Sequence, residues 1–303
     1  MLARIAENLY WMGRYLERAE NTARILEVQF EATAQAAPEW PSTWWRKVLD
    51  AFEAPAAIQP AEKAVVSWLA EQGENPNGLR SCLYRVHENA RLTRFYLNLE
   101  IWEAVNRLRR LTGIPLLDEP VALHQFCTQI CQASHLVMGI TEVTLPRDQA
   151  FYLVRCGRYL ERADTMLRTL GLLAAVSPEP ALRDHQFRSL LRSVSALEAY
   201  RKRFRKLEAI GIGQFLLLDS DFPRSVRFSL SGLHRSLEAL RRLVGGSDAA
   251  LRDAGRLAAT LEYCDSASEV LEREQPGLEE LLARIAAVHV RLSQQYFYLG
   301  SAG

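Results

Sequence analysis

Hydrophobic side chains recur in steps of three and four along the first thirty residues of the chain. The positions are Leu2, Ile5, Leu9, Met12, Leu16, Ala19, Ala23, Leu26 and Phe30. This spacing places the apolar side chains along one seam and predicts a helix of about 35 residues. Pro38 and Pro41 are expected to end it, because proline cannot continue the helical hydrogen-bond ladder.

The rest of the chain carries the same period and almost no strand pattern. It predicts helices over 44–52, 62–71, 81–111 with a break near Asn98, 120–138, 146–178, 182–206, 212–218, 223–244, 247–263 and 278–299. Pro146 is expected to open the fifth of these helices, and Asp221 or Ser220 to cap the one that begins at Pro223. No low-complexity linker divides the chain, so we predict an all-α, multi-helix bundle.

One seven-residue segment, Gly-Arg-Tyr-Leu-Glu-Arg-Ala, occurs twice, at residues 13–19 and 157–163. The apolar seam around the first copy recurs around the second in the same register. We interpret this as an internal duplication within a single domain of 1–303, with related halves of about 1–140 and 145–303. The two long helices are expected to pack antiparallel, or crossed about a pseudo-twofold axis, at the centre of the fold.

A polar stripe accompanies the seam in both copies. It comprises Arg14, Glu17, Arg18, Asn21 and Arg24 in the first, and Arg158, Glu161, Arg162, Thr165 and Arg168 in the second. Such a stripe can form an ion-pair network that sets helix packing, or it can line a site for a carboxylate ligand. If the two helices meet, Arg14 or Arg18 should pair with Glu161, or Glu17 with Arg158 or Arg162.

Composition narrows the function classes. The 303 residues carry a net charge of +1, so no global field favours nucleic acid or anionic membranes. Arg4, Glu7 and Arg14 interrupt any secretory leader, and the apolar runs are too short to span a bilayer. The odd number of cysteines fits reduced thiols. We therefore expect a cytoplasmic protein without a nucleic-acid or membrane partner.

Three other constellations have simpler explanations than chemistry. The helical group His124, Cys127, Cys131 and His135 spans roughly 16 Å at 1.5 Å per residue, too far for one tetrahedral ion. The acidic pair at 219 and 221 could bind a divalent ion, but helix capping is the simpler interpretation. The basic run 201–206 could hold an anion or a phosphate backbone, but a solvated helix end is the simpler interpretation. No metal site is predicted, and no phosphate-binding loop or catalytic triad is present.

Several phrases together resemble the alpha-E family of bacteria. They are residues 8–24, Glu88-Asn89-Ala90-Arg91, Glu100-Ile101-Trp102-Glu103 with Asn106, residues 157–163, Tyr200-Arg201, and Leu217-Leu218-Asp219 with Phe222-Pro223-Arg224-Ser225-Val226. The resemblance runs from residue 1 to about 300. It departs at Val86-His87, where the family tends to carry Ala-Arg.

The resemblance implies an all-helical protein encoded beside, or fused to, a circularly permuted ATP-grasp protein, often with transglutaminase-like and N-terminal-nucleophile hydrolase-like proteins. Those neighbours imply ATP-dependent amide-bond formation. The chain would then be an accessory protein that binds a substrate or partner of such a ligase system, with ATP and Mg²⁺ bound only by the partner ligase.

Two alternatives stay open beside this one. The chain could be an enzyme with an Arg/Glu-lined pocket for a carboxylate or peptide substrate, or a purely structural helical scaffold. The candidate binding residues are Arg14, Arg18, Asn21, Arg24, Asn89, Arg91, Arg158, Arg162 and Arg224. The candidate acid/base residues for an enzyme are Glu17, Glu88 and Glu161.

Overall fold

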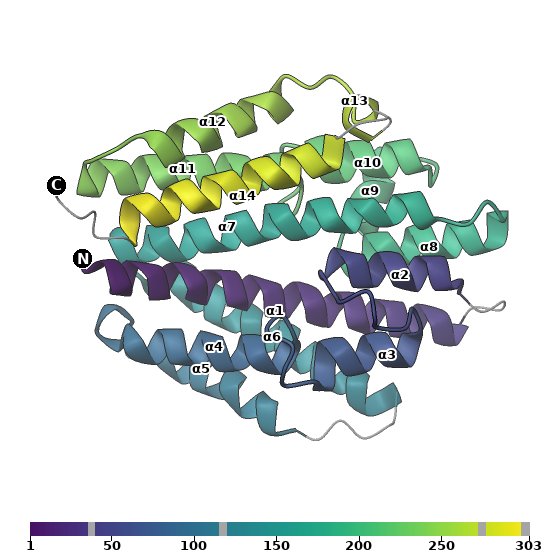
Figure 1. Cartoon of the computed structure of the whole chain (residues 1–303), viewed down its shortest axis with the longest axis horizontal. Helices are drawn as coiled ribbons and strands as arrows, with labels where there is room; N and C mark the ends of the chain where they lie inside the picture. The colour runs from purple at the N-terminus through teal and green to yellow at the C-terminus, as the bar shows by residue number, and fades with distance from the viewer. Residues whose placement is uncertain (36–39, 115–119, 272–276, 298–303) are drawn as a thin grey trace.

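The computed structural model describes residues 1–35, 40–114, 120–271 and 277–297, and within these ranges it contains helices and no strands. Two long helices, α1 (Ala3–Gln35) and α7 (Gln149–Leu170), lie side by side at the centre (Figure 1). The remaining α-helices are α2 (Ser42–Ala51), α3 (Glu62–Val66), α4 (Leu79–Leu92), α5 (Leu99–Arg110), α6 (Pro120–Thr144), α8 (Pro180–Ser193), α9 (Leu197–Arg203), α10 (Ala209–Leu218), α11 (Val226–Val244), α12 (Ala249–Glu262), α13 (Ser268–Leu271) and α14 (Gly277–Tyr296). The predicted all-α class is confirmed.

The apolar seam of α1 explains its length. Leu9, Met12, Leu16 and Ala19 are all buried, so the helix is stabilised along its face by packing and not by intrinsic propensity alone. The helix extends to Gln35, close to the predicted length. The predicted stop at Pro38 and the predicted end of the last helix near residue 299 lie outside the described residues.

Two predicted helix starts are wrong, and capping explains both. α7 begins after Asp148, whose Oδ1 accepts hydrogen bonds from the backbone N–H groups of Ala150 and Phe151, at 2.9 and 3.2 Å. α11 begins after Ser225, whose Oγ accepts from the N–H of Phe228 at 3.0 Å. In each case a side chain that satisfies free N–H groups, and not the nearby proline, sets the first turn.

The predicted helix 182–206 is also wrong, because it is two helices. Ser195 has a φ of +54°, a left-handed conformation that a continuous helix does not allow, and it separates α8 from α9. The predicted break near Asn98 is confirmed: its Oδ1 accepts from the N–H of Ile101 at 2.9 Å and caps α5. The predicted end of α11 is confirmed too, at Gly245 with φ +75°.

The central helices touch at two glycines. A Cβ added at Gly13 would lie 2.2 Å from the carbonyl oxygen of Val154, and one at Gly157 would lie 2.1 Å from that of Tyr10. Exchanging the two helices turns the first contact into the second, as a pseudo-twofold axis between them would. Figure 1 shows the helices running in the same direction, so the antiparallel alternative is wrong and the crossed one describes the contact.

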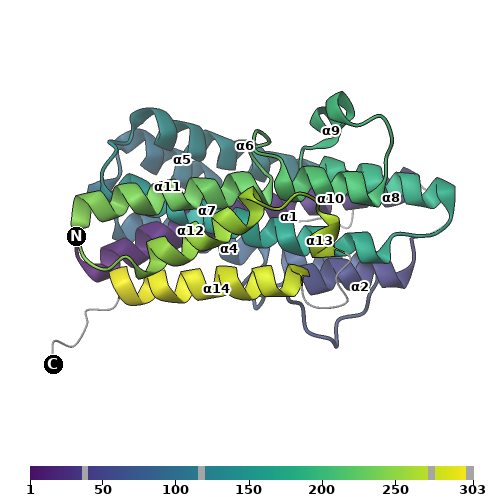
Figure 2. The same ribbon diagram turned by 90° about the horizontal axis from the view of Figure 1, so that it is seen from above.

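The outer helices surround the central pair in a matched order. α4 and α6 pack on α1 while α11 and α14 pack on α7, and α5 and α12 cover the two outer pairs (Figures 1 and 2). α8 packs on α1, and α2 packs on α7 and the turn that follows it, so each half contributes a helix to the other. The matched order of the outer helices supports an internal duplication and a single domain with two halves. Both remain predictions.

None of the helices in the described ranges is long and apolar enough to cross a bilayer.

The close contact at Gly13 generates a stability prediction. We expect Gly13→Ala to lower the free energy of unfolding by about 1–3 kcal/mol, because the new methyl group would push against backbone atoms that cannot move independently. Gly139 in α6 is the matched control, since a Cβ there meets nothing within 4 Å. Gly139→Ala should instead stabilise by about 0.5–1 kcal/mol, the usual gain in an exposed helix interior. Urea unfolding measures both, and equal effects of the two substitutions would contradict the close crossing.

Candidate functional site

The Arg/Glu stripe lies between α1 and α7 and is largely buried. Glu161 of α7 is held by two arginines of α1: Arg14 Nε lies 2.6 Å from its Oε2, and Arg18 Nε lies 2.5 Å from its Oε1. A second Arg18 nitrogen, Nη2, donates to Oε2 at 3.1 Å. The remaining arm of Arg18 reaches Asn77, just before α4.

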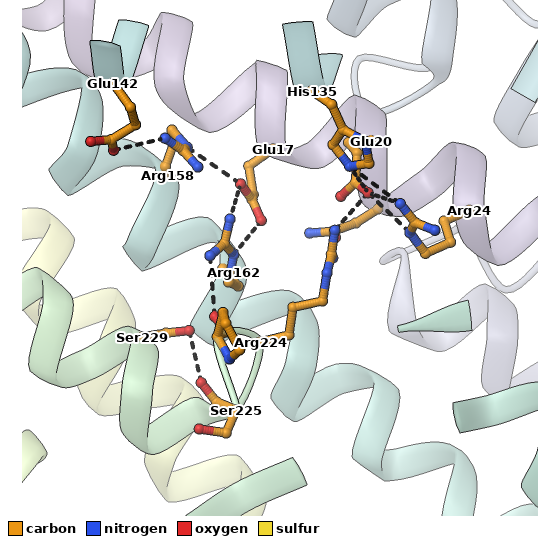
Figure 3. Close-up of polar contacts among 12 residues, drawn as sticks. Glu17, Glu20, Arg24, His135, Glu142, Arg158, Arg162, Arg224, Ser225 and Ser229 are labelled. Atoms are coloured by element: carbon orange, nitrogen blue, oxygen red, sulfur yellow. Dashed lines mark hydrogen bonds and ion pairs between the residues drawn. The ribbon is translucent and has the colours of Figure 1, made fainter. Parts of the chain in front are cut away.

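The reciprocal cluster holds Glu17 of α1 (Figure 3). Arg162 of α7 binds both of its oxygens, at 2.5 and 2.8 Å, and Arg158 Nε lies 3.6 Å from Oε2. Arg162 also donates to the carbonyl of Pro223, just before α11, at 3.1 Å. Both predicted cross-helix pairings are therefore confirmed, and each cluster extends to the segment before its own outer helix.

A third cluster surrounds Glu20, which sequence reasoning missed (Figure 3). Its Oε1 lies 2.5 Å from Arg24 Nη2, 2.6 Å from Arg224 Nη2 and 3.2 Å from His135 Nε2. Arg224 also donates to Oδ1 of Asn21 at 2.7 Å, so it ties the segment before α11 to α1. The available signal was the aligned acid of the second copy, Asp164, which pairs with Arg168 at 2.7 Å just as Glu20 pairs with Arg24.

The arginines keep these carboxylates ionised. Burial acts to raise the pKa of Glu161, but Arg14 and Arg18 more than reverse this and lower it to about 2. Burial also acts to raise the pKa of Glu17, but Arg162 acts against it, and the pKa of Glu17 is lowered. A carboxylate whose pKa is lowered stays ionised at neutral pH, so it has no proton to donate and is a weak base, which suits neither residue to general acid/base catalysis.

The third catalytic candidate, Glu88, lies elsewhere on α4. It pairs with Arg91 at 2.9 Å and with His87 at 3.1 Å, and hydrogen bonding from Arg91 lowers its pKa. Its neighbour Asn89 belongs to the same surface and not to the buried network. The structure thus separates the predicted site residues into an internal network and an external group on α4.

The external group lines a surface groove of about 540 Å³ between α1 and α4, here called the α1–α4 groove. Its wall from α1 includes Asn8, Trp11 and Tyr15, and its wall from α4 includes Arg85, Glu88 and Asn89. The rings of Trp11 and Tyr15 stack with centroids 5.3 Å apart, and Arg85 donates to the Tyr15 hydroxyl at 2.6 Å. The guanidinium of Arg14 lies 5.2 Å from the Trp11 ring, so the groove rests directly on the Glu161 cluster.

The helical histidines and cysteines do not assemble into a metal site. His124 lies 3.3 Å from Glu27, whereas His135 lies against Glu20 in the third cluster. Among the residues that the structure describes, no three His, Cys, Asp or Glu side chains converge as metal ligands would. Asp219 shapes the turn before α11, where its Oδ1 accepts from the N–H groups of residues 221 and 222.

Fold and site together define an all-helical protein whose two central helices are joined by reciprocal Arg–Glu clusters beneath a flanking groove. The chain belongs to the Alpha-E family. The family model, described as a predicted alpha-helical domain with a conserved ER motif, matches residues 1–297. Glu-Arg pairs stand at 17–18 and 161–162, and both are part of the buried clusters.

Relatives of this chain are found in mycobacteria. An uncharacterized protein of Mycobacterium bovis and one of Mycobacterium tuberculosis are each 23% identical over 270 residues, which cover 80% of this chain and 30% of theirs. A protein from another strain of M. tuberculosis is 22% identical with the same coverage. The chain therefore spans about a third of the length of these relatives. No solved structure matches it.

The Glu161 cluster generates a prediction for stability and its pH dependence. We expect Glu161→Gln to cost about 3–5 kcal/mol at pH 7, because it leaves two arginines without their shared buried charge. The pKa of Glu161 falls from its ordinary 4.5 to about 2 on folding. Its contribution is therefore complete above about pH 5 and declines as the pH falls toward 2.

Chemical unfolding of wild type and variant between pH 7 and pH 3 measures this. The difference between the two proteins should be constant from pH 7 to about 5 and should shrink below that. Glu238→Gln is the matched control, because Glu238 forms a half-exposed pair with Arg242 one helical turn away. It should cost no more than about 0.5 kcal/mol. A difference independent of pH would show that the Glu161 charge does not stabilise the fold.

Proposed function

We propose that this chain is the substrate- or partner-binding component of an ATP-grasp-type amide-bond (peptide) ligase system, and that it binds through the α1–α4 groove. One observation carries the proposal: two family phrases far apart in sequence, residues 8–24 and 88–91, contribute side chains to a single groove. Packing of α1 on α4 accounts for their proximity. Packing does not explain why both segments place polar side chains without hydrogen-bond partners among the described residues in this groove.

Those open groups suit a peptide or carboxylate ligand. Arg4, Glu7, Asn8 and Asn89 line the groove and make no side-chain hydrogen bond or ion pair within the described part of the chain. An asparagine amide can donate to and accept from a peptide group, and a guanidinium can bind a carboxylate. The stacked Trp11 and Tyr15 rings add an apolar wall, which is the usual composition of a binding groove.

The chemistry itself would belong to partners. In this proposal a circularly permuted ATP-grasp protein binds ATP and Mg²⁺ in the cytoplasm and forms the amide bond. A transglutaminase-like protein would be a further partner. The longer mycobacterial relatives support a role beside other domains, because the segment that they share with this chain is 30% of their length.

The two alternatives have less support from the geometry. An enzyme acting on a carboxylate needs an acid or base that exchanges protons, and Glu17, Glu88 and Glu161 all have lowered pKa values. A purely structural scaffold accounts for the buried clusters, which hold the central helices together. It gives no reason for the open polar side chains of the α1–α4 groove.

The test is affinity capture from the native host with the tagged chain as bait. Wild type should recover an ATP-grasp protein, and Asn8→Ala combined with Asn89→Ala should lower that recovery at least tenfold. These two side chains make no hydrogen bond with any described residue, so the double variant should have the melting temperature of the wild type. Gln125→Ala with Gln132→Ala, which removes two exposed amides from α6, should leave recovery unchanged. Recovery of no ATP-grasp protein, or equal recovery by all three baits, would refute the proposal.

A further inference from the structure

A surface groove lies among α8, α9 and α10, helices that Figure 2 places far from the N-terminus. Its volume is about 710 Å³, and we call it the basic groove. Arg183 and Arg188 of α8 lie on one side, and Arg201, Arg205 and Lys206 lie on the other. The interpretation of the 201–206 run as a solvated helix end is therefore incomplete, because four of its six residues line a concave surface.

Positive charge in the basic groove exceeds negative charge by three. Five cationic side chains line it with only two carboxylates, Asp184 and Glu208. Both carboxylates pair at long range, Asp184 with Arg183 at 4.0 Å and Glu208 with Lys206 at 3.9 Å. Three guanidinium groups are left, and they make no hydrogen bond or ion pair with any described residue: Arg188, Arg201 and Arg205.

The first turn of α10 adds to this charge. Glu208 and Ala209 line the basic groove, and the helix begins between them. The cap position, Glu208, makes no side-chain hydrogen bond to the first turn, so the free N–H groups of that turn have no acceptor there. A helix start of this kind favours an anion, through its N–H groups and through the helix dipole.

The wall that carries Arg205 and Lys206 is fixed in place by a buried tyrosine. The Tyr200 hydroxyl donates to the carbonyl of Lys206 at 2.7 Å, and its ring stacks on Phe204 with centroids 4.7 Å apart. Gly211 makes room for this arrangement, since a Cβ there would lie 2.7 Å from the Tyr200 hydroxyl oxygen. The groove is therefore shaped before any ligand arrives, which lowers the entropy lost on binding.

We propose that the basic groove is a binding site for a small oxyanion ligand that carries more than one phosphate or carboxylate group. Unpaired guanidinium forks bind both groups through paired hydrogen bonds, and several cationic centres around one groove select a multiply charged molecule. This site stands independently of the α1–α4 groove and of the ligase proposal.

Isothermal titration of the full chain at physiological salt tests the proposal, with inorganic tripolyphosphate and citrate as probes. At least one probe should bind saturably, and the better one tells whether the natural ligand carries phosphate or carboxylate groups. Arg201→Gln with Arg205→Gln should weaken that binding at least tenfold, and Arg188→Gln on the opposite wall at least threefold. None of the three side chains forms a hydrogen bond or an ion pair with a described residue, so the variants should have the melting temperature of the wild type.

Arg107→Gln with Arg110→Gln is the control, because it removes the same charge from two exposed, unpartnered arginines of α5. It should change the affinity less than twofold. Saturable binding of neither probe would overturn the proposal. So would an equal loss in the α5 control, since it would show that the probes respond to charge anywhere on the surface.

Discussion

The fold depends on buried carboxylates that each receive two arginines from the opposite central helix. Arg14 and Arg18 hold Glu161, and Arg158 and Arg162 hold Glu17 in the reciprocal cluster. Neither a carboxylate nor a guanidinium can be buried alone without a large loss of hydration energy, so each becomes stable only when the other helix is in place. Because the free arms of the arginines reach the segments before α4 and α11, the same contacts also position the outer helices.

This arrangement separates structure from binding. The arginines and glutamates that resemble a catalytic or ligand-binding stripe in the sequence pair with one another inside the protein. The lowered pKa values of Glu17 and Glu161 keep both carboxylates ionised there. Open polar side chains of the kind that bind ligands instead line two surface grooves, the α1–α4 groove and the basic groove. The internal clusters support the first of these directly, through the contact of Arg14 with Trp11.

The sequence predicted those features of the structure that depend on the spacing of side chains along a single helix. The repeated stripe predicted the cross-helix pairs, because seam and stripe stay in register along both helices. It could not predict that the helices run in the same direction, since one helix presents the same stripe to either kind of neighbour. Ser195 gave no sign of its left-handed turn, and Arg224 gave no sign that it reaches Glu20 across the fold. The basic run 201–206 was interpreted as a solvated helix end for the same reason, because the two walls of the basic groove meet only after folding.

A double-mutant cycle on Glu17 and Arg162 shows whether the buried clusters join the two central helices. Urea unfolding of the wild type, Glu17→Gln, Arg162→Gln and the double variant gives the coupling energy between the two side chains. If the reciprocal clusters join the central helices, the coupling should exceed about 2 kcal/mol, near the upper end for directly interacting pairs. Single effects that add to within about 0.5 kcal/mol would show that the two residues act independently and that their contact does not join the helices.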